Sequence, residues 1–300
     1  MKDQAEKLRE IINNIKSHNE ASLSNNISAK KTGARVITIT SGKGGVGKTN
    51  FTVNLGIRFA QLGYRVVIID ADLGLANVDV VMGKMSKYNL SDVINSDKSI
   101  LEILEEGPSG VKFISGGSGV QDLIKLNKAQ LVDILIKLGK LDDEADIILI
   151  DTGAGLSENV MSFVHAAREV ILVTTPEPTS ITDAYALIKT ITYRDKNKNI
   201  KIVVNRADNP AEALNILDKL NIVTEKFLGV KLHKLGYILN DACVSKAVKM
   251  QQPFVQSFVK SEATKNLHSI AGTLLDNKEM NEASKSGIRM FINKLSNIFG

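Results

Sequence analysis

The stretch from Gly42 to Thr49 has the residue types and spacing of a loop that binds phosphate groups. It reads GKGGVGKT, which satisfies G-x-x-x-x-G-K-[ST] directly after an apolar run and before a helical pattern. Glycines let the backbone curl around an anion, and the exposed N–H groups hold phosphates together with the helix N-terminus. Lys48 should neutralise the β- and γ-phosphates, and the Thr49 hydroxyl should bind Mg²⁺. The alternative is a tight strand-to-helix turn without a ligand. The expected nucleotide-binding residues of this loop are Gly42, Lys43, Gly44, Gly45, Val46, Gly47, Lys48, Thr49 and Asn50.

Acidic residues follow two further apolar runs, where they can meet a metal ion bound to phosphate. Asp70 and Asp72 end the run at 64–72, and Asp151 ends the run at 146–151. In a doubly wound sheet the carboxyl ends of the strands border the ligand crevice, so these carboxylates should lie near Mg²⁺ and the γ-phosphate. Asp151 is expected to hold the hydration shell of the metal ion, and Asp70 to lie close to the metal. The alternative is that these acids cap the helices that follow them.

Asn205 and Arg206, at the end of another apolar run, indicate whether the nucleotide is ATP or GTP. Loops that bind GTP carry N-K-x-D at this point, whereas this chain reads Asn205, Arg206, Ala207, Asp208. Arginine therefore replaces the lysine that would stack on guanine, while the aspartate is retained. We expect Asn205 and Arg206 to belong to the nucleotide site, and we expect the nucleotide to be ATP.

Six short apolar runs, rich in β-branched residues, alternate with longer helical stretches such as 48–62. The runs occupy residues 36–41, 64–72, 146–151, 169–176, 200–205 and 235–239. Nearly continuous apolar runs are typical of strands covered on both faces, and the helices between them supply the crossovers of a parallel sheet. The sequence predicts an α/β fold of the P-loop NTPase kind, with a doubly wound, mostly parallel sheet in a single domain and flanking amphipathic helices.

Bulk composition agrees with a large folded domain and argues against several other classes. The 300 residues are 43% hydrophobic, and 38 basic against 33 acidic side chains give a net charge of +5, too mild an excess to indicate nucleic-acid binding. The single cysteine, Cys243, cannot form an intramolecular disulfide, and the four histidines lack the spacing of metal ligands. No run approaches the roughly 20 apolar residues of a spanning helix. We expect a cytoplasmic protein that is not integral to a membrane.

The two ends of the chain differ in composition from the domain predicted at 35–276. Residues 1–16 place apolar side chains at helical spacing, and residues 17–34, rich in Asn, Ser and Lys, indicate a flexible linker. Residues 277–300 begin as a polar connector and end as a second amphipathic helix. Cations flank its apolar face, as they do in helices that lie at the interface of anionic membranes. The alternative is that this helix packs on the domain as its last element. The apolar face consists of Ile288, Phe291, Ile292, Leu295, Ile298 and Phe299.

The first lysine of the phosphate loop, Lys43, indicates a family. With it the loop reads KGGVGKT, which resembles the deviant Walker A motif of the MinD/ParA ATPases, and the resemblance extends over about residues 35–275. It implies an ATP-bound homodimer in which Lys43 reaches the partner's nucleotide, as an arginine finger would. It also implies that Asp72 orients the attacking water and that Asn205 holds the edge of adenine. Lys43, Lys48 and Asp72 are therefore the expected catalytic residues. The alternative for Lys43 is an ordinary solvated loop lysine.

Within this family, the chain most resembles the FlhG group, which controls flagellar number and placement. Nitrogenase-type iron proteins ligate a cluster through paired cysteines, which the single Cys243 cannot supply. The opening residues match D-Q-A-x-x-L-R, which FlhG proteins carry ahead of the ATPase domain. The resemblance implies that this helix stimulates the GTPase FlhF, that the ATP-bound dimer binds the inner face of the cell membrane reversibly, and that flagellar switch (C-ring) proteins are further partners. The expected partner-binding residues are Asp3, Gln4, Ala5, Leu8 and Arg9.

Two other hypotheses stay open. A MinD-like regulator of the division site would have the same ATPase domain, and residues 1–16 would then be dispensable for every partner. A ParA-like partition ATPase would bind DNA, for which the mild basic excess is the only support. We expect no specific nucleic-acid partner.

Overall fold

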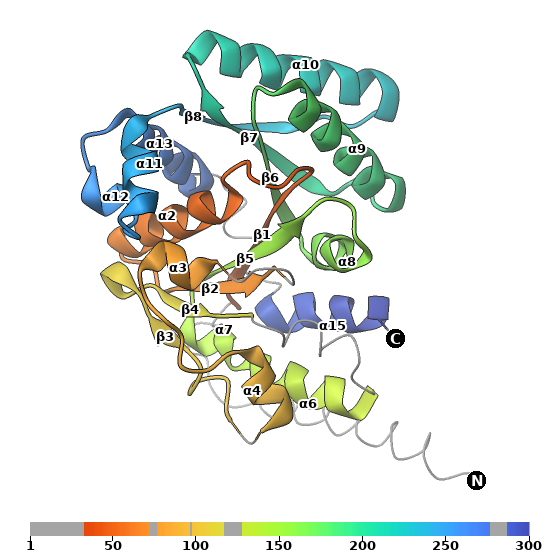
Figure 1. Cartoon of the computed structure of the whole chain (residues 1–300). Helices are drawn as coiled ribbons and strands as arrows, with labels where there is room; N and C mark the ends of the chain where they lie inside the picture. Colours follow the sequence, from red (N-terminus) through yellow and green to blue (C-terminus); the bar gives the residue numbers. More distant parts are fainter. Residues whose placement is uncertain (1–32, 73–76, 97, 117–127, 277–286, 300) are drawn as a thin grey trace. The chain divides into compact units, whose positions relative to one another are not determined.

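One eight-stranded sheet forms the centre of the computed structural model, which describes residues 33–72, 77–96, 98–116, 128–276 and 287–299 (Figure 1). The strand order is β3-β4-β2-β5-β1-β6-β7-β8, and every neighbouring pair is parallel except β3 and β4. This confirms the predicted mostly parallel α/β fold. The strands are β1 (Arg35–Ser41), β2 (Val66–Ala71), β3 (Glu105–Glu106), β4 (Lys112–Ile114), β5 (Ile147–Ala154), β6 (Glu169–Thr174), β7 (Asn199–Ala207) and β8 (His233–Leu239).

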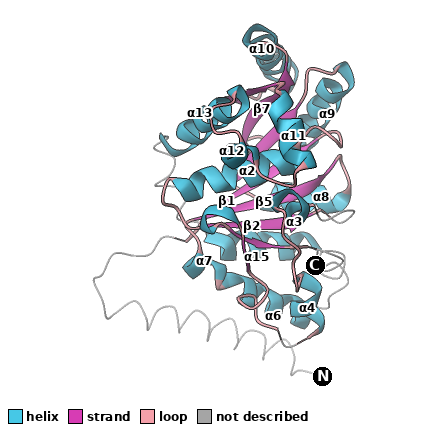
Figure 2. Ribbon diagram, turned by 60° about the vertical axis from the view of Figure 1, so that its left-hand side comes forward, coloured by secondary structure: helices cyan, strands magenta, loops and turns pink. Residues whose placement is uncertain are grey.

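Helices cover both faces of the sheet and bury a separate hydrophobic core on each (Figure 2). One face carries α2 (Lys48–Gln61), α3 (Val78–Met82), α11 (Ala242–Lys249), α12 (Phe254–Ser257) and α13 (Glu262–Asp276). The other carries α4 (Leu90–Asn95), α6 (Lys128–Gly139), α7 (Leu141–Glu144), α8 (Glu158–Ala166), α9 (Pro178–Arg194), α10 (Pro210–Leu228) and α15 (Gly287–Phe299). A short 3₁₀ turn, Pro108–Gly110, lies between β3 and β4.

Strand β1 shows why the apolar runs of the sequence become central strands. All seven of its residues are buried, because helices lie above and below it. Side chains alternate along a strand, so Val36 joins one core while Ile37 and Ile39 join the other. A strand covered on both faces has no solvent-facing position, so Arg35, Thr38, Thr40 and Ser41 are buried together with its apolar residues.

The carboxyl ends of the central strands meet at one edge of the sheet. Asp151 pairs in register with Ile39 of β1 on one side and with Asp70 of β2 on the other. The chain passes from β1 to β2 on one side of β1 and later continues through β6, β7 and β8 on the other side. Such a reversal opens a crevice beyond the end of the strand at which it occurs, here β1. The loop from Gly42 to Gly47 leaves β1 at this point.

The C-terminal amphipathic stretch forms the predicted helix, α15, but the helix lies on the domain. Ile288, Phe291, Ile292 and Leu295 are at most 8% exposed, because α6, α7, α8 and the start of β1 surround this face. The rings of Phe291 and Phe163 on α8 have centroids 6.2 Å apart. The structure therefore shows the packed alternative that the sequence left open, and it differs from the expectation of a helix standing apart from the domain.

Two other expectations concern segments that the structure does not describe. The predicted partner-directed helix at 1–16 and nearly all of the linker predicted at 17–34 lie outside the described residues. Residues from Gly33 onward form one compact unit by their internal contacts. Within the described ranges, no helix combines the length and apolar character that crossing a bilayer demands.

Candidate active site

The loop from Gly42 to Gly47 requires glycine at two positions, Gly42 and Gly47. A Cβ on Gly42 would lie 2.4 Å from the backbone of Asp183, because α9 packs directly against the start of the loop. Gly47 has φ +87°, in the left-handed region that glycine favours, and it precedes the first residue of α2. The loop therefore turns sharply and directs the first N–H groups of α2 toward the crevice, which is the arrangement that binds an anion at a helix N-terminus.

Lys48 and Thr49 meet the carboxylate of Asp151 at the base of this loop. Lys48 Nζ lies 3.1 Å from Asp151 Oδ1, and the Thr49 hydroxyl donates to Asp151 Oδ2 at 2.6 Å. Thr52, one turn further along α2, donates to Asp151 Oδ1 at 3.0 Å. The Lys48 side chain is 7% exposed and that of Asp151 is 1% exposed, so this ion pair is held in a site of low dielectric constant. The three residues named by sequence as phosphate and metal ligands thus lie together.

The donors at this point suit a hydrated Mg²⁺ ion that is also bound to phosphate. Mg²⁺ takes oxygen ligands, keeps several waters and commonly uses one or two protein oxygens together with substrate phosphates. The Thr49 hydroxyl and Asp151 Oδ2 provide two such oxygens side by side. In the described part of the chain, no cluster of three or more His, Cys, Asp or Glu side chains could hold a metal ion by itself. The residues fit a metal that arrives with a nucleotide.

Asp70 lies beside this cluster, but its carboxylate is occupied by backbone N–H groups. Asp70 Oδ1 accepts from the N–H of Asp72 at 3.0 Å, while Oδ2 accepts from Asn77 at 2.9 Å and from Val78 at 3.1 Å. Burial, followed by the charge of Asp151, raises the pKa of Asp70 to about 7, although these three hydrogen bonds act in the opposite direction. In this structure Asp70 binds the backbone at Asp72, directly after β2, and at Asn77 and Val78, where α3 begins, and its predicted place near the metal stays a prediction.

The carboxylate of Asp72 lies against the end of β5. A Cβ added to Gly153 would lie 3.4 Å from Asp72 Oδ1, so the carboxylate sits directly over this glycine. Two residues later, Gly155 has φ +90° and donates its N–H to the carbonyl of Ser41, the last residue of β1, at 2.8 Å. The ends of β1 and β5 and the first residue after β2 are therefore in contact.

Lys43, the residue predicted to act on a partner's nucleotide, is held at the surface by the loop after β6. Its Nζ lies 2.6 Å from Glu177 Oε2 and 3.0 Å from Thr179 Oγ1. The side chains of Lys43 and Glu177 are 39% and 57% exposed, so solvent screens their charges and the pair adds little to stability. The Lys43 hydrogen bond and charge, with a smaller effect of Arg206, lower the pKa of Glu177. Lys43 can therefore exchange this partner for another anion at little cost.

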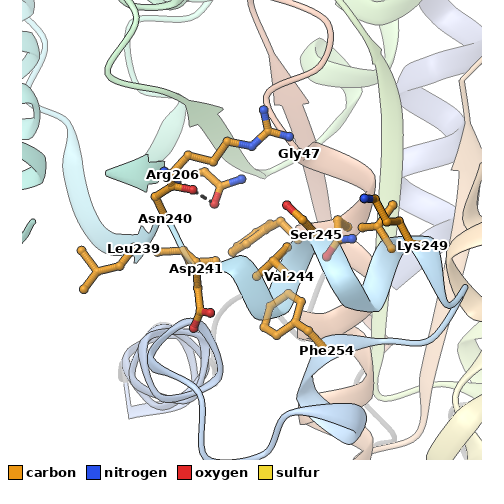
Figure 3. Close-up of a pocket in the computed structure, with 14 residues that line it drawn as sticks. Gly47, Arg206, Leu239, Asn240, Asp241, Val244, Ser245, Lys249 and Phe254 are labelled. Atoms are coloured by element: carbon orange, nitrogen blue, oxygen red, sulfur yellow. Dashed lines mark hydrogen bonds between the residues drawn. The ribbon is translucent and has the colours of Figure 1, made fainter. Parts of the chain in front are cut away.

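A cavity of about 310 Å³ opens beside the phosphate loop, between β7, β8 and α11 (Figure 3). Asn205 lies on its wall, with its Nδ2 donating to the carbonyl of Val46 at 2.7 Å and its Oδ1 accepting from the N–H of Arg206 at 3.0 Å. A Cβ on Gly47 would lie 2.5 Å from Asn205 Nδ2. Asn205 therefore joins the end of β7 to the phosphate loop. The cavity has the size and position for the base of a nucleotide whose phosphates lie on that loop.

The structure brings the predicted residues of the nucleotide site together and leaves others outside the described chain. The phosphate loop, Asp70, Asp72, Asp151, Asn205 and Arg206 all border one crevice. Thr52 and Glu177 were not predicted. Thr52 follows Lys48 by one helical turn, a spacing that could have placed it beside Asp151, whereas no local pattern links Glu177 to Lys43. Partner residues Asp3, Gln4, Ala5, Leu8 and Arg9 lie outside the described residues, as does the side chain of Phe299.

The chain is similar to known nucleotide-binding proteins along most of its length. Residues 37–254 match the model of the CobQ/CobB/MinD/ParA nucleotide binding domain. The chain is 43% identical over 237 residues to the antiactivator FleN of Pseudomonas aeruginosa, which covers 79% of this chain and 85% of FleN. It is 32% identical over 274 residues to the flagellum site-determining protein YlxH of Helicobacter pylori, which covers 90% and 92%. The solved structure of the septum site-determining protein MinD of Pyrococcus horikoshii, complexed with Mg-ADP, has a TM-score of 0.65 and 26% identity, covering 81% of this chain and 96% of that one.

Proposed function

Because the chain belongs to the CobQ/CobB/MinD/ParA family of nucleotide-binding domains and is an ATPase, we propose that it is a dimerising ATP-controlled switch that sets the number and placement of flagella. The observation that carries the flagellar role is the similarity to FleN and YlxH, which extends over most of both proteins. The structural likeness to MinD supports the fold and the proposal of an ATP-controlled switch.

The proposed ATP and Mg²⁺ site consists of the phosphate loop with Lys48, Thr49 and Asp151. Lys48 and Thr49 both contact Asp151 at the carboxyl edge of the sheet, which supports this assignment. When bound, Mg²⁺ neutralises charge on the β- and γ-phosphates. Lys48 would exchange its contact with Asp151 for phosphate oxygens, and the adenine would occupy the cavity beside Asn205 and Arg206.

Hydrolysis is assigned to Lys43 and Asp72. Lys43 lies at the surface in an exposed ion pair with Glu177, from which it can turn to the phosphates bound by a second copy of the chain. A positive charge delivered there would stabilise the charge that spreads over the transferred phosphoryl group. The position of Asp72 over Gly153 supports a role in orienting water, because both residues border the crevice beyond β1.

We assign binding to the inner face of the cell membrane to the C-terminal helix. Helix α15 exposes Arg289 and Lys294 to solvent while it buries Phe291 and Leu295. The side chains that would enter the lipid are those that now contact the domain, so membrane binding requires α15 to leave its site. A single helix of this length binds lipid weakly, and two copies in an ATP-bound dimer would bind far better through their effective concentration. Nucleotide state would then control residence on the membrane.

The remaining proposed partners are the GTPase FlhF, contacted through residues 1–16, and the flagellar switch (C-ring) proteins. The support is the D-Q-A-x-x-L-R match at the start of the chain and the similarity to flagellar proteins. A specific nucleic acid is not proposed, since the net charge of +5 is small for a chain of 300 residues.

The flagellar role is tested by expressing the full chain in Helicobacter pylori cells that lack YlxH and recording the number and position of flagella on each cell by electron microscopy. We expect the chain to bring the flagellar count back toward that of the parent strain. The Lys48→Ala variant, expressed at the same level, should have no effect, because it cannot neutralise the bound phosphates. Equal counts with and without the chain would contradict the flagellar role.

The partner role is tested with the full chain and purified FlhF. GTP hydrolysis by FlhF should increase in the presence of the chain, and the double variant Gln4→Ala, Leu8→Ala should lose this effect while keeping its own ATPase rate. If neither the unaltered chain nor the double variant changes GTP hydrolysis by FlhF, FlhF is not a partner of residues 1–16.

The alternative of a partition ATPase is tested by DNA binding. Salt-sensitive retention of the chain on DNA, with none on anionic vesicles, would favour it.

A further inference from the structure

The carboxylate of Asp142 on α7 binds two backbone N–H groups from distant parts of the chain. Asp142 Oδ1 accepts from Ile288, near the start of α15, at 2.8 Å and from Ala34, directly before β1, at 3.0 Å. Arg289 Nε lies 3.9 Å from Asp142 Oδ2, and the Asp142 side chain is 14% exposed. Asp142 Oδ1 thus binds both the first turn of α15 and the residue directly before β1. A negative charge at a helix N-terminus also interacts favourably with the helix dipole.

The backbone around Asp142 is packed too closely for a side chain. A Cβ on Gly33 would lie 2.6 Å from Gly287 Cα, and a Cβ on Gly287 would lie 2.8 Å from Asp142 Oδ2. Gly287 also has φ +52°, in the left-handed region, so a larger residue would be strained there. The first described residues therefore lie against the first turn of α15, and the two glycines make this approach possible.

Arg35, which follows Ala34, contacts α13, the helix that precedes residues 277–286. Its Nη1 donates to the carbonyl of Leu274 near the end of α13 at 2.7 Å, and its Nε and Nη2 bind Glu169 at 2.7 and 2.8 Å. Residues 33–35 thus contact both the helix that precedes residues 277–286 and the helix that follows them. The side chains of Arg35 and Glu169 are 2% and 3% exposed, whereas that of Asp142 is 14% exposed, so water reaches the Asp142 end more readily.

We propose that Asp142 is a positioning residue that latches α15 to the domain and, through the same carboxylate oxygen, couples the docking of α15 to the start of β1. The regulatory meaning of this latch rests on the proposed membrane function of α15. When α15 leaves, Gly33 loses its contact with Gly287 and Asp142 becomes accessible to water, which competes for the N–H of Ala34. Release of the C-terminal helix therefore loosens Gly33 and Ala34, directly before β1, so α15 and the start of β1 respond together.

The latch is tested in the full chain by amide hydrogen exchange, without lipid or partner. In Asp142→Ala, the amides of Ile288 and Phe291 on α15 and of Ala34 should exchange about 2- to 30-fold faster, the range for loss of a helix-capping side chain. Amides of Leu172 and Val203, in the centre of the sheet, should not change. Asp133→Ala removes an exposed acid of α6 that pairs with Lys137, and it serves as the matched control.

Two further variants separate the latch from general destabilisation. Asp142→Asn keeps an oxygen acceptor for both N–H groups and should retain most of the protection. Loss of protection equal to that of Asp142→Ala would overturn the role of the shared hydrogen-bond acceptor. Gly287→Ala keeps the residues Asp142 and Ala34 in the sequence but places a Cβ 2.8 Å from Asp142 Oδ2 at the first turn of α15, and it should speed exchange at Ala34 as well as at Phe291. Its control is Gly272→Ala on α13, where a Cβ meets no atom within 4 Å.

The outcomes decide between the latch and its alternatives. Unchanged exchange on α15 in Asp142→Ala overturns the latch. Faster exchange on α15 in Gly287→Ala with no change at Ala34 overturns the coupling to β1. Equal acceleration at Leu172 and Val203 would show global unfolding and contradict a local latch. Because none of these measurements uses lipid, a failure of the latch is distinguishable from a failure of α15 to bind membranes.

Discussion

Replacing Phe163 by leucine tests whether docking of α15 limits binding to a membrane. Phe163 belongs to α8, so the change weakens the site on the domain and leaves the sequence of α15 unaltered. The rings of Phe163 and Phe291 are 6.2 Å apart, and the two side chains are 7% and 5% exposed. An aromatic pair contributes about 0.5–1.5 kcal/mol beyond its buried area, and leucine keeps most of the apolar contact. At 1.4 kcal/mol for each factor of ten, the undocked population of α15 should rise about 2- to 12-fold.

The assay measures the fraction of protein that sediments with vesicles rich in anionic phospholipid, at a lipid concentration that binds only a small fraction of the unaltered chain without ATP. Phe163→Leu should raise this fraction by the same factor as it raises amide exchange at Phe291. The matched control is Phe227→Leu on α10, an aromatic side chain that is 66% exposed and far from the described contacts of α15. If exchange at Phe291 rises while vesicle binding stays constant, the docked helix does not limit membrane binding, and the reasoning is refuted.

Three other predictions follow from the site and the core. Asp72→Ala should keep ATP binding but slow hydrolysis and prolong the dimer on lipid, and rapid turnover of ATP by this variant would refute the assigned role. The pKa of Asp70 is raised to about 7 in the folded chain from an ordinary value of 3.8, so its contribution to stability is complete below about pH 4 and is lost as pH rises through about 7. Mg²⁺ beside Asp151 favours the ionised form of Asp70, so Mg²⁺ affinity measured by calorimetry should increase from about pH 6 to about pH 8, and Asp70→Asn should remove that increase. Glu169→Ala should lower the free energy of unfolding by about 3–5 kcal/mol in urea titration, because it leaves two buried cations without their shared carboxylate, and a loss under 1 kcal/mol would show that water replaces it.

The nucleotide site could be predicted from the sequence because its chemistry is local. Gly42 to Thr49 follows one strand and opens one helix, so a single stretch contains the residues and their geometry. Asp151 could be added because parallel strands bring their carboxyl ends to the same edge. By contrast, β3 and β4 span two and three residues, which is too short for any periodic pattern to be recognised. Glu177 was missed because its contact with Lys43 joins residues 134 positions apart.

The position of α15 on the domain could not be predicted from the sequence, for a different reason. Apolar residues at helical spacing with cations beside them have the same pattern whether the apolar face enters lipid or packs on protein. Phe291 and Leu295 suit both lipid and a protein core. Whether they pack on the domain depends on the site formed by α6, α7 and α8, which no local sequence pattern predicts. Under the proposed function α15 alternates between the domain and a membrane, which requires a docked state only slightly more stable than the free state. Close contacts at one point, such as Asp142 with Gly287, can set that balance while the apolar face remains free to bind lipid once it is released.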